Sequence, residues 1–287
     1  MARAAPDRTG QIIGGRYQVV SLLGEGGQSS VYRAKDLRVG DEVALKILKP
    51  GADAESTERM FREARAMASL QGTAALHVLD QGWTDEGSMC LVTELLEGLP
   101  LDDLLDAREK EGLRTDVQMA MTLFGPVVNT LRAAHEIGIV HRDLKPANIF
   151  VLSNGRGVRL LDFGFAKFQR MRGLTADGMI AGSPSYIAPE TWLGKYDVID
   201  HRIDVYALAA VIFRFFAGHA PFSSTDLGTL LRQVTGAERP SLHAVRPDLS
   251  PDVDDWVNLS LAIDPSKRFQ TVVAMWRALG YALGVQT

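Results

Sequence analysis

The distribution of apolar residues changes near residue 95, and this change most constrains the fold. Before it, β-branched or apolar runs alternate with glycine-rich or polar turns, a pattern typical of strands. Strands are predicted at 17–23, 31–36, 42–48, 76–81 and 89–94. One helical pattern covers 56–70, where Ser56 or Thr57 could form the N-cap. The first part of the chain therefore predicts a five-stranded sheet with one helix.

After residue 95 the patterns are mainly helical. Helices are predicted at 101–108, at 116–137 and through most of the chain after 190, and a strand pair is predicted at 149–152 and 158–161. Gly125-Pro126 is expected to kink or interrupt the second helix, because proline lacks an amide hydrogen. Strands first and helices second favour an α+β protein with two lobes and a cleft between them.

Charge and cysteine content exclude several classes of protein. The 287 residues carry a formal net charge of −4, which argues against a dedicated nucleic-acid-binding protein. The single cysteine, Cys90, excludes an intramolecular disulfide framework and any CxxC metal site. Because it lies in a predicted strand, Cys90 is expected to be a small buried apolar group.

Neither a secretory signal nor a membrane span is expected. The first ten residues contain no apolar segment, and residues 1–15 are predicted to form a disordered or weakly attached arm. The most membrane-like stretch, 205–217, is too short to cross a bilayer and contains Arg214. A cytoplasmic protein is therefore predicted.

A glycine-rich segment, Gly24-Glu25-Gly26-Gly27, lies between two predicted strands. Glycines allow a backbone to approach a ligand closely, and their amides can donate to phosphate oxygens. From this segment alone, an ordinary hairpin turn is at least as good an interpretation. A dinucleotide-binding fingerprint is disfavoured because a strand follows the glycines where that motif needs a helix.

Lys46 lies among apolar residues in the predicted strand 42–48, where an ammonium group that points inward needs a partner. Glu63 follows on the predicted helix. An ion pair between these two residues would join strand to helix and direct the ammonium group towards a phosphate. A surface lysine without a special role is the alternative.

The most specific signal is an ionisable cluster, His141-Arg142-Asp143-Leu144-Lys145-Pro146-Ala147-Asn148, which is flanked by apolar residues. Asp143 could accept a proton while Asn148 offers a neutral oxygen to a cation. Further along, Asp162-Phe163-Gly164 ends a predicted strand with a carboxylate. Hard oxygen ligands of this kind suit Mg²⁺, which shares its coordination shell with substrate phosphates.

Taken together and in this order, these motifs resemble those of eukaryotic-type serine/threonine protein kinases, especially the bacterial members. The resemblance covers about 17–283. It implies a bilobal protein-kinase fold with the ATP cleft between the lobes. The implied domains are an arm at 1–15, a small β lobe at 16–95, a larger mainly α lobe at 96–283 and a tail at 284–287.

The resemblance also implies roles for individual residues. Asp143 should accept the proton of the substrate hydroxyl, Lys145 should contact the transferring phosphate, and Asn148 and Asp162 should hold Mg²⁺, with Mn²⁺ as the alternative ion. Lys46 should hold the α- and β-phosphates while paired with Glu63. The residues implied to contact ATP are Leu23, Gly24, Gly26, Val31, Ala44, Lys46, Thr93 as gatekeeper, Glu94, Leu96, Glu97 and Phe150.

Other implied roles concern the scaffold and its regulation. Glu190 should form a buried ion pair with Arg268, and Asp204 should anchor the backbone of the catalytic loop. Arg142 should pair with a phosphate on the activation segment, where Thr175 and Ser183 are the candidate hydroxyls. The third glycine of the usual loop motif is replaced by Ser29.

The favoured prediction is an ATP-dependent kinase that phosphorylates serine or threonine in proteins and autophosphorylates its own activation segment. A catalytically silent pseudokinase scaffold and a small-molecule phosphotransferase are the alternatives. Protein substrates are the expected partners, with no nucleic acid, and a transient dimer could serve autophosphorylation. Because the chain ends soon after its last predicted helix, signals are expected to arrive through cytoplasmic partners, the arm or the activation segment.

Overall fold

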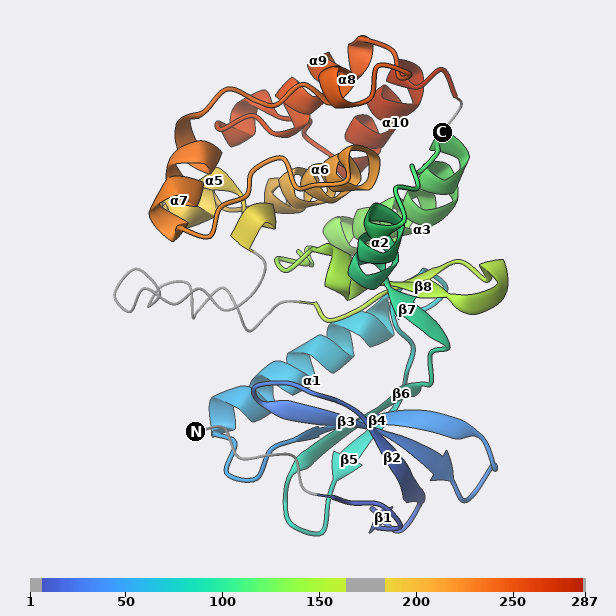
Figure 1. Ribbon diagram of the computed structural model, residues 1–287. Coiled ribbons are helices and arrows are strands. Elements are labelled where there is room, and N and C mark those ends of the chain that lie inside the picture. Colours follow the sequence, from blue (N-terminus) through green and yellow to red (C-terminus); the bar gives the residue numbers. More distant parts are fainter. Residues whose placement is uncertain (1–6, 164–183, 286–287) are drawn as a thin grey trace. The chain divides into compact units, whose positions relative to one another are not determined.

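The computed structural model describes residues 7–163 and 184–285, and the chain divides into two compact units, one ending at Glu97 and the other beginning at Gly98 (Figure 1). The predicted boundary between 95 and 96 lies two residues earlier. The first unit is mainly sheet and the second mainly helix, so the α+β prediction is confirmed.

The first unit is a six-stranded antiparallel sheet with one helix. Its strands follow the order β1-β2-β3-β4-β6-β5. They are β1 (Ile12–Ile13), β2 (Tyr17–Glu25), β3 (Ser29–Asp36), β4 (Glu42–Leu48), β5 (Val78–Trp83) and β6 (Met89–Glu94). Helix α1 (Ala54–Ser69) packs against β5 and β6.

Alternation along the strands places apolar side chains in the core of this unit. In β3, Tyr32 and Ala34 are buried while the intervening residues are partly exposed, as expected for a sheet with one covered face. β6 is buried along nearly its whole length, and Cys90 within it is 2% exposed. The prediction that this cysteine is a buried apolar group is confirmed.

The N-terminal residues differ from the prediction of a weakly attached arm. Ile12 and Ile13 form β1 and pair with Gln18 and Tyr17, which adds a sixth strand to the sheet. Arg8 is 4% exposed, and its Nη2 lies 2.6 Å from Oε2 of Glu86. The arm prediction is therefore wrong for residues 7–15, because backbone pairing at the sheet edge outweighs their polar composition.

Helix α1 begins earlier than predicted. Its N-cap is Asp53, whose side chain accepts a hydrogen bond of 2.7 Å from the amide of Ser56. A carboxylate at this position satisfies an amide that the helix leaves unpaired and interacts favourably with the helix dipole. The proposed caps, Ser56 and Thr57, instead lie within the first turn.

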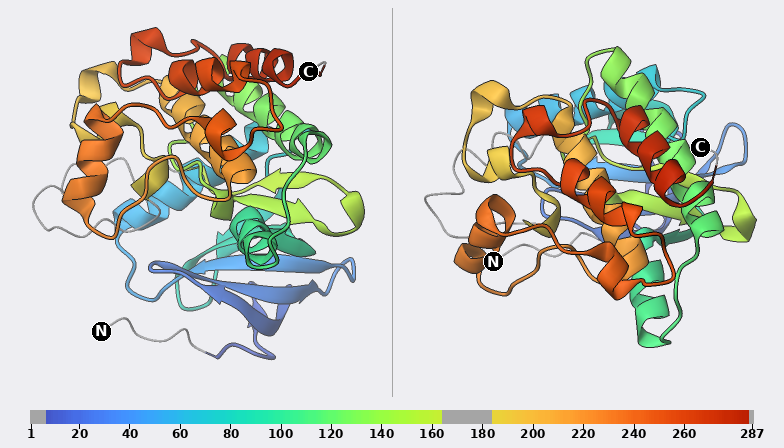
Figure 2. Two further views of the ribbon diagram at one scale, coloured as in Figure 1. Left: turned by 45° about the horizontal axis from the view of Figure 1, so that its top comes forward. Right: turned by 90° about the horizontal axis from the view of Figure 1, so that it is seen from above.

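The second unit is built around helices (Figure 2). It has one small sheet of three strands in the order β7-β8-β9. Its strands are β7 (Gly98–Pro100), β8 (Ile149–Leu152) and β9 (Val158–Leu160). Its described α-helices are α2 (Leu101–Lys110), α3 (Val117–Glu136), α5 (Pro189–Trp192), α6 (Arg202–Ala217), α7 (Leu227–Gly236), α8 (Leu242–Val245), α9 (Asp252–Ser260) and α10 (Val272–Ala282). Nearly all of α6 is buried, and it contacts α3, α8, α9 and α10.

Of the kink or interruption expected at Gly125-Pro126 of α3, the interruption does not occur. The helix continues through Pro126, whose carbonyl accepts a hydrogen bond of 2.9 Å from Oγ1 of Thr130. Phe124 and Val127 on either side are fully buried. Burial of this apolar face offsets the amide hydrogen bond that proline cannot make. Within 7–163 and 184–285, no helix is long and apolar enough to cross a membrane.

Candidate active site

The first component of the site is an ion pair within the first unit. Lys46 points from β4, and its Nζ lies 2.8 Å from Oε1 of Glu63 on α1. The side chains are 21% and 15% exposed respectively. Met60 and Met67 of α1 are buried in the core, and they fix the helix that carries Glu63. The predicted strand-to-helix pair is therefore present and remains accessible to a small ligand.

The glycine-rich segment is the tip of the β2–β3 hairpin. Gly24 stands opposite Val31, and the amide of Gly26 donates a hydrogen bond of 2.8 Å to the carbonyl of Ser29. A Cβ on Gly26 would lie 3.4 Å from that carbonyl oxygen, which is an ordinary van der Waals contact. Leu23, before the glycines, is 51% exposed.

Several residues expected to contact a nucleotide are neighbours in the sheet register. Val31 stands opposite Lys46 across β3 and β4. Ala44 stands opposite Thr93 across β4 and β6. Ala44 and Thr93 are 8% and 6% exposed, so both present small side chains at a tightly packed part of the sheet.

Beyond Thr93 the chain leaves β6 through Glu94, Leu96 and Glu97. The amide of Glu94 donates to the carbonyl of His77 at 3.1 Å, and its carboxylate accepts from the amide of His77 at 2.9 Å. These two bonds hold the end of β6 in place. Leu96 is partly buried and Glu97 is exposed.

The second unit brings Asp143, Lys145 and Asn148 together in one loop. Nδ2 of Asn148 donates to the carbonyl of Asp143 at 2.7 Å and to its Oδ2 at 3.1 Å. Nζ of Lys145 lies 3.5 Å from the same Oδ2. The Asp143 carboxylate is therefore oriented by an amide and an ammonium group, and its side chain is 17% exposed.

Asp204 of α6 holds the backbone of this loop from within the core, as predicted. Its Oδ2 accepts from the amide of His141 at 2.8 Å and its Oδ1 from the amide of Arg142 at 2.9 Å. Nε2 of His135 lies 2.8 Å from Oδ2. Burial alone would raise the pKa of Asp204, but the His135 hydrogen bond, both histidines and the Arg142 amide together lower it below 3.8.

Two residues beside these groups have backbone conformations that side chains usually avoid. Arg142 has φ of 66° and Asp162 has φ of 42°, and no other non-glycine residue in the described part of the chain has a positive φ. Such a conformation costs about 1–2 kcal/mol per residue. Backbone strain of this kind concentrates at functional sites.

His141 connects the loop to the segment that carries Asp162. It is fully buried, its Nδ1 accepts from the amide of Asp143 at 3.3 Å, and its Nε2 donates to the carbonyl of Leu161 at 3.0 Å. Its ring packs on Phe163 with centroids 4.7 Å apart. Burial lowers the pKa of His141 below 6.5, although nearby carboxylates oppose the shift. The neutral histidine thus serves as a structural bridge.

The donor chemistry of Asn148 and Asp162 fits Mg²⁺. The amide of Leu161 donates to the carbonyl of Asn148 at 2.8 Å, which ties the two segments together. Because Nδ2 of Asn148 is directed to Asp143, its amide oxygen is oriented away from that loop contact. One amide oxygen and one carboxylate form the small, hard ligand set with which proteins hold Mg²⁺ beside phosphates.

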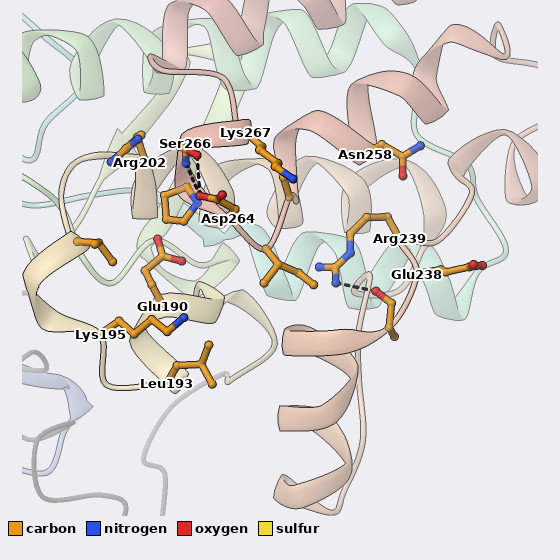
Figure 3. A pocket seen from close by; sticks show the side chains of 15 residues that line it. Glu190, Leu193, Lys195, Arg202, Glu238, Arg239, Asn258, Asp264, Ser266 and Lys267 are labelled. Atoms are coloured by element: carbon orange, nitrogen blue, oxygen red, sulfur yellow. Dashed lines mark hydrogen bonds between the residues drawn. The ribbon is translucent and has the colours of Figure 1, made fainter.

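Glu190 and Arg268 form the predicted buried ion pair. Nη1 and Nη2 of Arg268 lie 2.6 Å from the two carboxylate oxygens of Glu190, and the side chains are 0% and 2% exposed. Nε of Arg268 also donates to the carbonyl of Ala262 at 2.6 Å. Glu190 lines a pocket of about 970 Å³ in the second unit, together with Arg239, Asp264, Ser266 and Lys267 (Figure 3).

The remaining predicted residues are placed as follows. Phe150 lies in β8, opposite Pro100 of β7 and Arg159 of β9. Arg142 is exposed. Thr175 and Ser183 lie outside the described residues. His135 was missed by the sequence analysis, because its contact with Asp204 spans 69 residues and no spacing pattern marks it.

The model of the protein kinase domain family matches residues 17–277, so the chain belongs to the protein kinase family. It is 34% identical over 266 residues to the serine/threonine-protein kinase PknL of Mycobacterium tuberculosis, covering 92% of this chain and 65% of that protein. It is 35% identical over 272 residues to PksC of Streptomyces coelicolor, covering 92% of this chain and 48% of that protein.

A solved structure agrees with this assignment. The crystal structure of the PknI kinase domain from M. tuberculosis is similar at a TM-score of 0.75 and 29% identity, covering 99% of this chain and 100% of that one. The fold is therefore the bilobal protein-kinase fold, of the bacterial serine/threonine kinase type. The chain spans 48% to 65% of the length of the two curated relatives named above.

Proposed function

We propose that this chain transfers the γ-phosphate of ATP to serine or threonine hydroxyls of proteins. The observation that carries the proposal is the loop in which Asn148 and Lys145 orient the Asp143 carboxylate while Asp204 holds the backbone. Such an arrangement suits a reaction in which alignment and charge neutralisation supply most of the acceleration.

Each group in the loop has a distinct proposed role. Asp143 accepts the proton of the attacking hydroxyl, and its hydrogen bond from Asn148 directs one carboxylate oxygen. Lys145 contacts the phosphate in transfer. Asn148 and Asp162 would hold Mg²⁺, which, when bound, neutralises phosphate charge and orients the phosphates.

The proposed nucleotide contacts come from the glycine-rich hairpin and the neighbouring strands. Lys46 binds the α- and β-phosphates, and Glu63 fixes the direction of its ammonium group. The hairpin amides near Gly24 and Gly26 cover the phosphates. The proposed contacts with the base and ribose are Leu23, Val31, Ala44, Thr93, Glu94, Leu96, Glu97 and Phe150.

A silent scaffold is disfavoured because Lys46, Asp143, Asn148 and Asp162 all carry the side chains that the chemistry needs. The test is phosphate incorporation from labelled ATP into a generic protein substrate, with Mg²⁺ or Mn²⁺, by the wild type and by Asp143→Asn. Loss of the general base should lower the rate by about 10²–10⁴-fold. No incorporation by the wild type with either ion would favour the scaffold.

Autophosphorylation at Thr175 or Ser183 is part of the same proposal, with Arg142 as the partner of the new phosphate. Two copies could meet transiently for this reaction. A cytoplasmic location is also proposed, since ATP and protein substrates are available there. Peptide mapping by mass spectrometry after incubation with ATP tests the modification. A fully active enzyme with both hydroxyls unmodified would contradict it.

A further inference from the structure

The tip of the glycine-rich hairpin is attached to α1 through one side chain. Oε1 of Gln28 accepts a hydrogen bond of 3.0 Å from Nη2 of Arg59, and its Nε2 lies 3.3 Å from Oγ of Ser56. The same Nη2 donates to Oγ of Ser56 at 2.6 Å. These three residues form a closed network, here called the hairpin–helix clamp.

The clamp is partly shielded from solvent. Ser56 is 5% exposed and the Arg59 side chain is 11% exposed. Nη1 of Arg59 also lies 3.1 Å from Oε1 of Glu55, so its charge is partly neutralised on the solvent side. Shielded hydrogen bonds to a charged group are stronger than exposed neutral ones.

The backbone reinforces this attachment. The carbonyl of Gln28 accepts from the amide of Lys49 at 2.9 Å, and Nζ of Lys49 lies 2.6 Å from Oε1 of Glu25. Gly26 and Gly27, just before Gln28, have no side chains with which to anchor the turn. Gln28 is therefore the residue through which the tip of the hairpin reaches the helix.

The clamp and the Lys46–Glu63 ion pair share one helix face. Ser56, Arg59 and Glu63 are spaced by three and four residues, which places them on one side of α1. The hairpin tip and the strand that carries Lys46 are thus fastened to the same stripe of the helix, one turn apart.

We propose that Gln28 is a positioning residue that makes the hairpin and α1 move as one element. The consequence for ATP rests on the proposed function: the hairpin would already be held in place before the nucleotide arrives. Preorganisation of this kind lowers the entropy lost on binding. Gln28 itself would contact no reacting atom and would act through the backbone of the hairpin.

Nucleotide binding gives the first test. Gln28→Ala should raise both the dissociation constant for ATP, measured by calorimetry, and KM for ATP by about 3- to 10-fold, the effect of one or two lost hydrogen bonds. kcat should change by less than about twofold. Arg59→Ala should raise the dissociation constant and KM for ATP by a similar factor. The double variant should raise them little further, because both changes break the same network. Gln81→Ala, at an exposed glutamine of β5, is the matched control.

Hydrogen exchange of the nucleotide-free protein gives a second test that does not depend on kinase activity. Gln28→Ala should speed exchange both in the hairpin, 24–31, and in the first turn of α1, whereas Gln81→Ala should not. Unchanged exchange in the helix would overturn the proposal, as would an ATP dissociation constant equal to that of the wild type. If the wild type fails to bind ATP while exchange responds as expected, the proposed function fails and the clamp stands.

Discussion

Two ion pairs in this protein each join a glutamate to a basic side chain, but they differ in burial and in the kind of cation. Arg268 and Glu190 meet through two parallel contacts of 2.6 Å, and neither side chain is more than 2% exposed. Nζ of Lys46 lies 2.8 Å from Oε1 of Glu63, and these side chains are 21% and 15% exposed. The first pair lies in the helical unit and the second in the sheet unit.

This difference distinguishes a pair that stabilises the fold from a pair that is proposed to bind phosphate. A planar guanidinium satisfied by a carboxylate and by backbone carbonyls has no remaining capacity for a ligand. A lysine ammonium group with three rotatable donors can hold a carboxylate and also donate to a phosphate oxygen. We therefore expect loss of the buried pair to affect stability, and loss of the accessible pair to affect phosphate transfer.

The largest expected effect is the loss of stability caused by Arg268→Ala. The substitution leaves the Glu190 carboxylate buried without its charge partner, which should lower the free energy of unfolding by about 3–5 kcal/mol. Chemical denaturation followed by circular dichroism measures it. The contrast between the pairs would break down if this variant were no less stable than Lys46→Ala.

The next largest effect is that of Lys46→Ala on catalysis. Because Lys46 is proposed to bind the α- and β-phosphates, its loss should slow phosphate transfer by about 10²-fold or more. Stability should fall by no more than about 1 kcal/mol, as for partly exposed pairs. Glu63→Gln, assayed alongside, should also slow transfer, because the ammonium group would lose its orientation. A stability loss as large as that of Arg268→Ala would show that accessibility does not distinguish the pairs.

A smaller loss of stability is expected when the pH is lowered, because His141 is buried and uncharged. Because its pKa in the fold is below the 6.5 of an exposed histidine, the unfolded chain binds more protons as the pH falls below 6.5. Stability should therefore decline from pH 6.5 downwards, towards the folded pKa. Thermal unfolding from pH 7 to pH 5 measures this, and His141→Gln should flatten the slope. A slope that is equal in both proteins would contradict it.

The smallest effect is expected at the exposed pair of Arg62 and Glu58 on α1. Both side chains are 57% exposed, and their atoms lie 3.0 Å apart. Arg62→Ala should cost no more than about 0.5 kcal/mol and leave phosphate transfer unchanged. This variant sets the baseline for both ion pairs. A slower rate of transfer would show that this face of α1 also affects the reaction.

Local pattern was sufficient where an element is an apolar run bounded by turns or polar residues. The predicted ranges for β4, β6 and β8 coincide with Glu42–Leu48, Met89–Glu94 and Ile149–Leu152. Each is an apolar run rich in residues that favour strands. The residues themselves suggested the Lys46–Glu63 pair and the resemblance implied the Glu190–Arg268 pair, and the structure contains both.

Where tertiary contacts decide, sequence reasoning failed. The two residues of β1 form a strand only because the edge of β2 offers them partners. Gly125-Pro126 stays helical because its neighbours are buried. His135 and Gln28 carry no local signal, since their roles come from Asp204 and Arg59, far away in the sequence.

The buried thiol has a practical consequence. Burial raises the pKa of Cys90 to about 12, so almost no reactive thiolate forms at neutral pH. Because the chain has no other cysteine, a thiol introduced at the surface can be labelled without first removing the native one. Gly27 suits a fluorescent dye, since a Cβ there would meet no atom within 4 Å. A single dye at that position would report the motion of the hairpin tip directly.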